Sequence, residues 1–331
     1  MPLQLISHSF ASEAMQSFIK GWPQLDWLDE EDIGKGEANH RFSLFNKQQG
    51  LYLFFTDLES YWQRYGAPKE PGGLVLSRLT FVLDFHEDFT PYSGLLPCNL
   101  AADATFDDAV RAAGTPQKSW SLTDNKIVKA RWIVSQQQID ISFSAQTGQM
   151  RLVAVSPTYL PEFQNRQAAS LPSPSDLTSL FGKPLKELAL LESMVPFELD
   201  QRGGEIQTYG EANFSKEYGL ELYFKPAQDF PEEYGINVEG TQLCLSGARY
   251  RCDLDFSSSG YLGVLPWGLS FDDPQQQVQQ RSSGVPVQQN FDRDDGSQRW
   301  LVDGYDVHIL YSFLEDKIYR VTLLAHGCYN D

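Results

Sequence analysis

The chain contains few of the residues that form disulfide and metal sites. Its 331 residues include four cysteines and five histidines, and no two cysteines form a Cys-x-x-Cys pair. Neither a disulfide framework nor a zinc site is therefore indicated, and such a low cysteine content is typical of a reducing compartment. We expect no bound metal and no cofactor.

Long hydrophobic runs are also missing. The stretch from Leu74 to Leu83 is among the longest, but Ser77, Arg78 and Thr80 interrupt it, and a bilayer span needs ~20 apolar residues. The first 20 residues have no basic segment followed by an apolar one, so a secretory signal is not expected. These observations predict a cytoplasmic protein.

Basic side chains are scarce relative to acidic ones. Lys and Arg number 26 against 44 Asp and Glu, which gives a formal net charge of −18. Nucleic acids and anionic lipid surfaces are bound by clustered Lys and Arg, and they would repel this chain. We therefore expect neither a nucleic-acid nor a membrane partner, and we expect a basic protein instead.

Sequence motifs of the common enzyme classes are absent as well. The patterns GxSxG, GxxxxGK[ST], HExxH and GxGxxG do not occur. Cys98 follows a Leu-Pro pair near a predicted helix start and could be a nucleophile, but its counterpart in the repeat described below is Trp267. A position that holds Cys in one copy and Trp in the other favours packing, so we expect no enzyme.

Two groups of carboxylates near predicted strand ends allow a chemical interpretation. Residues 84–88 read Asp-Phe-His-Glu-Asp and could bind a hard cation, but the counterpart beginning at Asp255 keeps only the Asp, which favours a solvated strand end. Asp253 and Asp255 would share a strand face and could form an acid–base pair. No partner base is evident, so a structural role such as capping a turn is favoured.

Aromatic and apolar residues, by contrast, are plentiful. Apolar residues make up 41% of the chain and aromatic residues 13%, whereas disordered chains are poor in both. The chain therefore predicts a sizeable hydrophobic core. Because domains usually have roughly 100 to 200 residues, two domains are expected.

One long internal repeat organises the sequence. Residues 36–39 read Gly-Glu-Ala-Asn, and residues 210–213 repeat them letter for letter. Gly50 and Gly219, which each open a Gly-Leu-x-Leu-x-Phe motif, stand 169 residues apart, and Trp132 and Trp300 stand 168 apart. A register that drifts so little over a hundred residues indicates a duplication, and the matching tryptophans are candidates for the two cores.

Each copy predicts the same order of elements. Helix signals are followed by strands with apolar residues at every second position, then a Gly-x-Leu-Pro turn, a second helix and a strand meander. The expected helices are 12–19, 106–113, 175–181 and 274–282, with Asp103 and Asp272 as plausible N-caps of the second helix. The expected strands are 50–55, 74–85, 129–134, 138–143 and 150–155 in the first copy, and 219–224, 243–256, 298–302, 306–311 and 318–324 in the second.

The fold class predicted from this order is α+β, with two tandem related units. The first unit covers residues 1–155 and the second 176–331. The segment 156–175 between them is rich in proline and small polar residues, so it predicts a linker.

The second half of each copy resembles a known family of folds. The pattern Gly-x-Leu-Pro-x-x-Leu, a helix, Gly-x-Pro, a Trp and a meander is similar to the helix-plus-meander unit of the beta-lactamase inhibitory protein and of the outer-membrane assembly lipoprotein BamE. That resemblance implies short helices packed on an antiparallel sheet. The acidic, duplicated whole also looks like a bacterial immunity protein, most closely those that neutralise type VI secretion nuclease toxins.

Acidic and aromatic residues supply the predicted contact surface. Trp and Tyr are favoured at the centre of binding interfaces, and complementary charge accelerates association. In the second copy the candidates are Trp267, Phe271, Asp272, Asp273, Asp292, Asp294 and Asp295; in the first copy they are Asp26, Asp29, Glu30, Glu31 and Asp32. The alternative interpretation of either acidic run is a solvated loop without a binding role.

The resulting functional hypothesis is an inhibitor that binds a basic toxin domain. Because a nuclease groove must hold phosphates, it is basic, and carboxylates can compete for it. We expect a type VI secreted DNase as the target, in a 1:1 complex, with the active site occluded. The alternative is a non-inhibitory adaptor or scaffold of a secretion system, and an enzyme with an unrecognised site ranks third.

Overall fold

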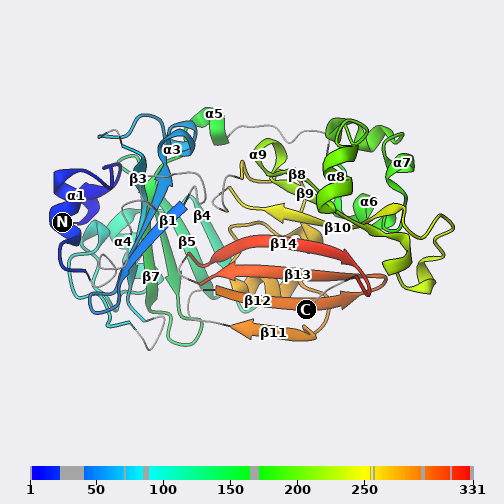
Figure 1. Ribbon diagram of the computed structural model, residues 1–331. Helices are drawn as coiled ribbons and strands as arrows, with labels where there is room; N and C mark the ends of the chain where they lie inside the picture. Colours follow the sequence, from blue (N-terminus) through cyan, green and yellow to red (C-terminus); the bar gives the residue numbers. More distant parts are fainter. Residues whose placement is uncertain are drawn as a thin grey trace. The chain divides into compact units, whose positions relative to one another are not determined.

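The computed structural model describes residues 2–22, 41–70, 72–84, 89–164, 171–253, 255, 258–291, 295–313 and 315–328. Figure 1 shows its ribbon. The chain divides into two compact units: unit 1 comprises residues 1–166 with 314–316, and unit 2 comprises residues 167–313 with 317–331. Each unit combines helices with one antiparallel sheet of seven strands, so the predicted α+β class and tandem units are confirmed.

Unit 1 alternates short helices with its seven strands. Its helices are η1 (Pro2–Leu5), α1 (Glu13–Ile19), α3 (Leu58–Tyr65), η3 (Pro97–Asn99), α4 (Phe106–Ala113) and α5 (Pro161–Gln164). Its strands are β1 (Arg41–Asn46), β2 (Leu51–Asp57), β3 (Leu74–Val82), β4 (Lys118–Ser121), β5 (Ile127–Val134), β6 (Gln137–Phe143) and β7 (Met150–Pro157).

Unit 2 begins with several short helices before its first strand. Its helices are α6 (Pro174–Ser179), α7 (Leu185–Leu188), η4 (Glu192–Phe197), α8 (Gly203–Tyr209), α9 (Ser215–Tyr218), η5 (Ala227–Asp229), η6 (Glu232–Tyr234), η7 (Pro266–Gly268) and α10 (Gln275–Arg281). Its strands are β8 (Glu211–Phe214), β9 (Leu220–Pro226), β10 (Leu243–Arg251), β11 (Gln288–Phe291), β12 (Asp295–Val302), β13 (Tyr305–Ser312) and β14 (Lys317–Ala325).

The two sheets share one topology. Unit 1 has the strand order β1-β2-β3-β7-β6-β5-β4, and unit 2 has β8-β9-β10-β14-β13-β12-β11 when read from the β8 edge. The Leu-Pro turn is repeated in backbone detail, because Cys98 and Asn99 have φ angles of 55° and 56° while Trp267 and Gly268 have 57° and 66°. Two consecutive left-handed residues at equivalent positions are rare outside glycine. The repeat read from the sequence is thus present in the fold.

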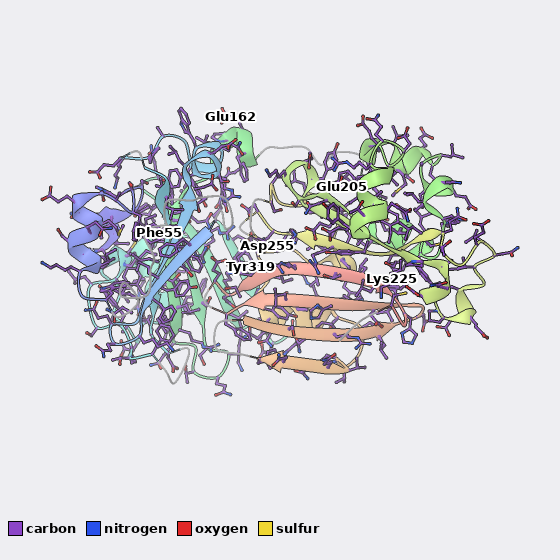
Figure 2. The ribbon with its side chains drawn as sticks, viewed as in Figure 1. Phe55, Glu162, Glu205, Lys225, Asp255 and Tyr319 are labelled. Atoms are coloured by element: carbon purple, nitrogen blue, oxygen red, sulfur yellow. The ribbon has the colours of Figure 1, made fainter. Side chains whose placement is uncertain are left out.

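Each unit has its own hydrophobic core between the helices and one face of the sheet. Phe55 of β2, labelled in Figure 2, is fully buried in the core of unit 1, and Phe224 lies at the equivalent place in the core of unit 2. Trp132 and Trp300 are 1% and 0% exposed, which confirms both as core residues. In unit 2, α6 and α7 pack on β10.

Local sequence signals explain where several elements begin. Ser12 caps α1 by accepting a hydrogen bond from the Met15 N–H, as the predicted helix at 12–19 requires. The predicted helix at 106–113 is α4, but its N-cap is Thr105 rather than Asp103. The Thr105 and Asp108 side chains each accept from the other residue's backbone N–H in a capping box. In unit 2 the residue before α10 is Pro274, so Asp272 is not the cap either.

Two predicted strands are shorter than expected. The strand predicted at 74–85 ends at Val82, because the N–H groups of Leu83 and Asp84 both donate to the carbonyl oxygen of Arg151 and break the ladder. The strand predicted at 243–256 ends at Arg251, and a turn from Cys252 to Asp255 follows. Asp253 and Asp255 therefore do not share a strand face.

The segment 156–175 contains some regular structure. Its first two residues end β7, residues 161–164 form α5, and residues 174–175 open α6. The division between the two units falls between Arg166 and Gln167. Among the described residues, no helix combines the length and apolar character that a membrane crossing needs.

Candidate partner-binding surface

Trp267 lies in the turn η7, which the Leu-Pro pair opens. Its indole ring meets the buried ring of Trp300 edge-on, with the centroids 5.4 Å apart. The side chain is half-buried, so part of the ring faces the core and part remains accessible. Aromatic residues placed in this way can anchor a partner, because they are already ordered before binding.

Arg281, the last residue of α10, ties this helix to the turn. The Arg281 Nη1 donates to the carbonyl oxygen of Gly268 at 2.9 Å and to Asp273 Oδ2 at 3.1 Å. Asp273 also accepts from the Ser270 N–H, and its side chain is 3% exposed. The carboxylate of Asp273 is thus buried and paired inside unit 2, so we leave it out of the contact surface proposed below.

Phe271 and Asp272 lie between the turn and α10, and both are half-buried. Phe271 packs against the core of unit 2, and its carbonyl oxygen accepts from the Ile318 N–H. The Asp272 N–H contacts Ser270 Oγ at 3.4 Å. Trp267, Phe271, Asp272 and Asp273 lie in the short segment that runs from η7 to the start of α10.

The remaining predicted acids cannot be placed in the same way. Asp26, Asp29, Glu30, Glu31, Asp32, Asp292 and Asp294 lie outside the described residues. Asp295 begins β12, where its backbone lies opposite Ser312, but its side chain is also outside the description. Three of these acids, Asp292, Asp294 and Asp295, directly follow β11 in the sequence.

The edge strand β11 is a feature that the sequence analysis missed. It forms one edge of the sheet in unit 2, and all four of its residues are exposed. Large apolar side chains that stay exposed gather around it: Val285 (83%), Val287 (56%), Phe291 (45%) and, on the next strand, Leu301 (46%). Val287 lies beside β12, because its N–H donates to the carbonyl oxygen of Arg299.

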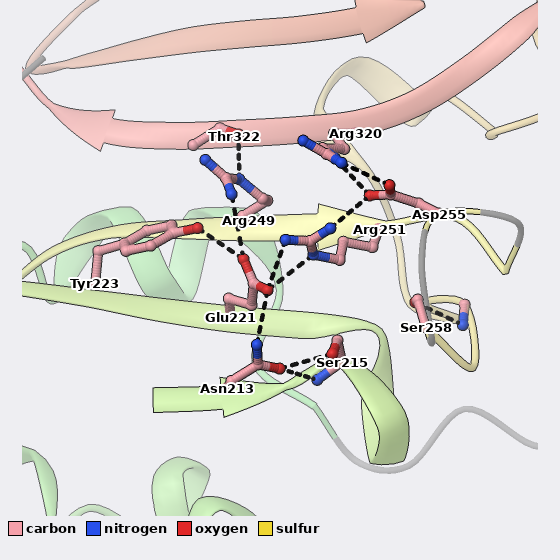
Figure 3. A network of polar contacts seen from close by, with 11 residues as sticks. Asn213, Ser215, Glu221, Tyr223, Arg249, Arg251, Asp255, Ser258, Arg320 and Thr322 are labelled. Carbon is pink, nitrogen blue, oxygen red and sulfur yellow. Dashed lines mark hydrogen bonds and ion pairs between the residues drawn. The ribbon is translucent and has the colours of Figure 1, made fainter. Parts of the chain in front are cut away.

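The sequence analysis also missed a charged network on the face of this sheet that points away from the core of unit 2. Figure 3 shows it at close range. Glu221 of β9 accepts from Asn213 at 3.0 Å and from the hydroxyl of Tyr223 at 2.7 Å, and its carboxylate also pairs with Arg249 and Arg251. Because Glu221 is buried, these partners replace the water that its charge would otherwise need.

Asp255 is the second acid of this network. Its carboxylate accepts from Arg251 Nη1 at 2.9 Å and from the Nε and Nη2 of Arg320 at 2.5 and 2.7 Å. The Arg320 contact is bidentate, which is the strongest geometry for an arginine–carboxylate pair. Asp255 is 3% exposed, so it acts as an internal counter-ion. This arrangement agrees with the structural role favoured from the sequence.

The network belongs to a polar row that crosses six strands. Register pairs connect Arg299 to His308, His308 to Thr322, Thr322 to Arg249, Arg249 to Glu221 and Glu221 to Asn213. Burial, helped by the positive charges of Arg249 and Arg299, lowers the pKa of His308 to about 4. At neutral pH this histidine is therefore uncharged, and it sits between two cations without adding a third.

The same face of unit 1 is apolar where unit 2 is charged. Tyr52, Phe54, Val82 and Leu152 occupy the positions equivalent to Glu221, Tyr223, Arg251 and Arg320, and with Phe89 they form a separate hydrophobic cluster. The alternating strand pattern could have signalled the charged residues of unit 2. Their pairing, however, depends on the register between strands far apart in sequence, which periodicity alone does not give.

The described part of unit 1 keeps a cluster of charged residues on this face. Asp140 of β6 accepts from Arg131 Nε at 2.6 Å, and Arg78 Nη1 lies 3.5 Å from its carboxylate. Burial alone would raise the pKa of Asp140, but the charges of Arg131 and Arg78 outweigh it and hold that pKa below its usual range. Arg131 and Arg299 are equivalent, and so are the residues opposite them, Asp140 and His308. Because His308 is not an acid, Arg299 pairs instead with Asp306, two residues before His308 in β13.

The structure also bears on the candidate nucleophile. Cys98 is half-buried in its left-handed turn, and burial raises the pKa of its thiol. A raised pKa leaves less thiolate at neutral pH, which is the opposite of an activated cysteine. Within the described ranges, no group of three or more His, Cys, Asp and Glu side chains is placed to hold a metal ion.

Comparison of the chain with protein-family models, curated proteins and solved structures gave no match. The resemblance to the beta-lactamase inhibitory protein and BamE units, and to immunity proteins, therefore stays a prediction from the sequence.

Proposed function

We propose that this chain is an immunity protein that binds a cognate bacterial toxin and inhibits it. The toxin is a basic domain, a type VI secreted DNase, and inhibition works by covering its active site. The proposal places the protein in the cytoplasm, in a 1:1 complex, without catalysis of its own. One observation carries it: the chain has a large acidic excess, and the buried ion pairs of the described residues contain more arginines than acids.

The larger number of arginines follows from how the buried acids are paired. Five of them, Asp140, Glu221, Asp255, Asp273 and Asp306, each pair with arginine, and together they engage seven arginines: Arg78, Arg131, Arg249, Arg251, Arg281, Arg299 and Arg320. Among the described residues, these buried pairs therefore take up more bases than acids, so they do not reduce the acidic excess of the chain.

Such a distribution suits a partner whose own site is cationic. A nuclease holds phosphates with Lys and Arg, so its groove attracts carboxylates and loses that attraction as salt is raised. The half-buried aromatic rings of Trp267 and Phe271 offer preordered apolar contacts beside the acidic residue Asp272. Charge would then accelerate encounter, and the aromatic contacts would hold the complex.

Co-expression with the toxin-like reading frame adjacent to this gene tests the proposal. Growth is scored with the toxin alone, with the toxin and this chain, and with the toxin and a chain truncated by an early stop codon. The purified pair is then analysed for stoichiometry by light scattering. Rescue by the intact chain together with a 1:1 complex supports the proposal, and a DNA-cleavage assay on the complex then identifies the inhibited activity.

The opposite outcome is equally informative. Toxicity that persists without any complex contradicts the immunity function and favours the scaffold alternative, which predicts loss of secretion without protection. Rescue in which substitution of one ionisable residue abolishes protection without weakening the complex would point to an enzyme. An interface residue acts through binding, so its substitution weakens the complex and protection together.

A further inference from the structure

We propose that β11 is the docking edge of this protein, where an extended basic segment of the partner adds as an eighth strand to the sheet of unit 2. This inference rests on the proposed function and specifies how the complex forms. An edge strand presents backbone N–H and C=O groups that no neighbouring strand uses, and they can pair with another chain. The inference depends on how β11 differs from the other edges.

β11 is the one edge strand of the two sheets without a charged residue. Charged side chains protect edges because they resist burial under an added strand. The other three edges each carry one: β1 begins with Arg41, β4 with Lys118 and β8 with Glu211. β11 reads Gln-Gln-Asn-Phe.

The equivalent edge of unit 1 shows what protection looks like. Lys118 lies opposite Arg131 as Gln288 lies opposite Arg299, so Lys118 and Gln288 are counterparts, and so are Trp120 and Asn290. In β4 the Lys118 ammonium lies over the Trp120 ring, 4.4 Å from its centroid, and the ring is buried. Unit 2 has replaced both residues by uncharged polar ones that are exposed.

Exposed apolar side chains near β11 also favour its burial by a partner. Val285 and Val287 precede β11, Phe291 is its last residue and Leu301 lies on β12, and all four side chains remain exposed. Pro286 has no N–H to donate, so strand pairing is confined to residues 287–291. An added strand over this stretch would bury apolar surface in addition to forming backbone hydrogen bonds.

Charge selects the occupant. The sequence after Phe291 has three Asp and one Arg before Gly296, and the chain as a whole carries −18. A second copy of this chain would bring the same acids to the same edge, which disfavours pairing between copies. A segment with Lys or Arg at one end and apolar residues along it fits both features.

Hydrogen exchange of the full-length complex tests the mode of binding directly. The probe is the toxin domain encoded beside this gene, mixed with the wild-type chain. We expect the amides of residues 287–291 that do not already donate to β12 to become at least tenfold more protected on binding, because an added strand engages the outward-facing backbone groups. The matched region of unit 1, residues 117–121, serves as the internal control and should be unchanged.

Paired substitutions test the same point by affinity. The double variant Gln288→Lys, Asn290→Lys places cations on the edge and should weaken binding at least tenfold, while Gln288→Glu, Asn290→Glu should not, because a basic segment tolerates acids. Ser119→Lys in β4 is the matched control and should bind normally. Circular dichroism verifies that each variant is folded.

The possible results separate this inference from the proposed function. Strand addition is overturned if the wild-type chain forms a tight complex without added protection of residues 287–291. It is also overturned if Gln288→Lys, Asn290→Lys and the control Ser119→Lys lose the same affinity. In both cases the inhibitor function stays intact. Absence of any wild-type complex overturns both. Concentration-dependent dimerisation that Gln288→Lys, Asn290→Lys abolishes would assign the edge to a second copy and overturn the basic-segment assignment.

Discussion

Trp132 and Trp300 occupy equivalent positions in the two sheets, but their indole N–H groups differ in their partners. Trp132 Nε1 donates to the carbonyl oxygen of Gly114 at 2.8 Å, whereas Trp300 Nε1 has no hydrogen-bond partner among the described residues. Both rings are almost completely buried. The duplication thus preserved the apolar role of this residue and changed its polar role, since Trp300 instead packs edge-on against Trp267.

This difference predicts unequal effects of one substitution. Trp132→Phe and Trp300→Phe remove similar ring volume, but only the former loses a hydrogen bond, so it should destabilise the protein by about 1 kcal/mol more. Urea denaturation followed by circular dichroism measures the difference, and hydrogen exchange shows which unit unfolds. Equal losses would mean that the Gly114 contact contributes nothing net.

Gly219 predicts a larger effect than an ordinary turn glycine. Its φ is +66°, and an added Cβ would lie 2.1 Å from the Tyr261 nitrogen and 2.4 Å from the Gly260 carbonyl carbon. Gly235, which follows η6, has the same left-handed conformation, but a Cβ there would meet nothing within 4 Å. Gly235→Ala should therefore destabilise by about 1 kcal/mol for the left-handed backbone alone. Gly219→Ala should destabilise clearly more, and equal melting temperatures for the two variants would contradict the close approach.

Asp255 predicts a strong dependence of stability on one buried carboxylate. Asp255→Asn leaves Arg251 and Arg320 without their shared counter-ion, and breaking a buried pair in this way costs about 3 kcal/mol or more. The matched control is Glu205→Gln, which removes the partly exposed contact of Glu205 with Arg202 and should cost less than about 1 kcal/mol. Chemical denaturation of both variants decides the matter. Similar small losses would show that water replaces Asp255 without penalty.

His308 predicts a pH dependence of stability. An unfolded histidine binds a proton below about pH 6.5, whereas the folded pKa of His308 is about 4. Between these values the unfolded chain binds more protons, so stability falls as pH drops. His308→Gln removes this contribution and should lose about 2 kcal/mol less stability than the wild type between pH 7 and pH 5. Measurement of the urea midpoint at both pH values, with an NMR titration of His308, checks the prediction, and an NMR midpoint near 6.5 would contradict it.

Much of the fold could be predicted because the repeat and the strand periodicity reinforce each other. The alternation of Leu51, Leu53 and Phe55 marks a strand whose alternate side chains enter a core, and the same letters recur at Leu220, Leu222 and Phe224. The four edge strands β1, β4, β8 and β11 were missed. Three of them have only four residues, and the polar sequence of β11 carries no apolar alternation to detect.

The site was less predictable than the fold, because charge has two uses in this molecule. Asp273 and Asp255 contribute to the acidic count, but arginine pairs hold both of them inside unit 2. Composition cannot distinguish an acid that neutralises a buried arginine from one that faces a partner. That distinction depends on tertiary pairing, such as the contact between Asp255 and Arg320, 65 residues apart in sequence.

The acids that follow β11 give the most direct prediction for the partner complex. Reversing Asp292, Asp294 and Asp295 to Lys should slow association with the toxin domain about tenfold at low salt, because steering acts on the encounter rate. This slowing of association should become smaller as the salt concentration rises, because salt screens the charges. Stopped-flow or biolayer interferometry at several salt concentrations measures the association rates of the variant and of the wild type.

A control with the same charge change distinguishes a local site from the field of the whole molecule. Asp103, Asp107 and Asp124 are exposed in unit 1, and their triple reversal to Lys alters the net charge equally. If the acids after β11 mark the contact, the control variant should associate nearly as fast as the wild type at 0.15 M salt, where the Debye length is about 8 Å and charges outside the contact are screened. Equal slowing by both variants would make steering a property of the total charge. Unchanged kinetics for the Asp292, Asp294 and Asp295 variant would instead move the contact to the run from Asp26 to Asp32, whose five acids provide the next reversal to test.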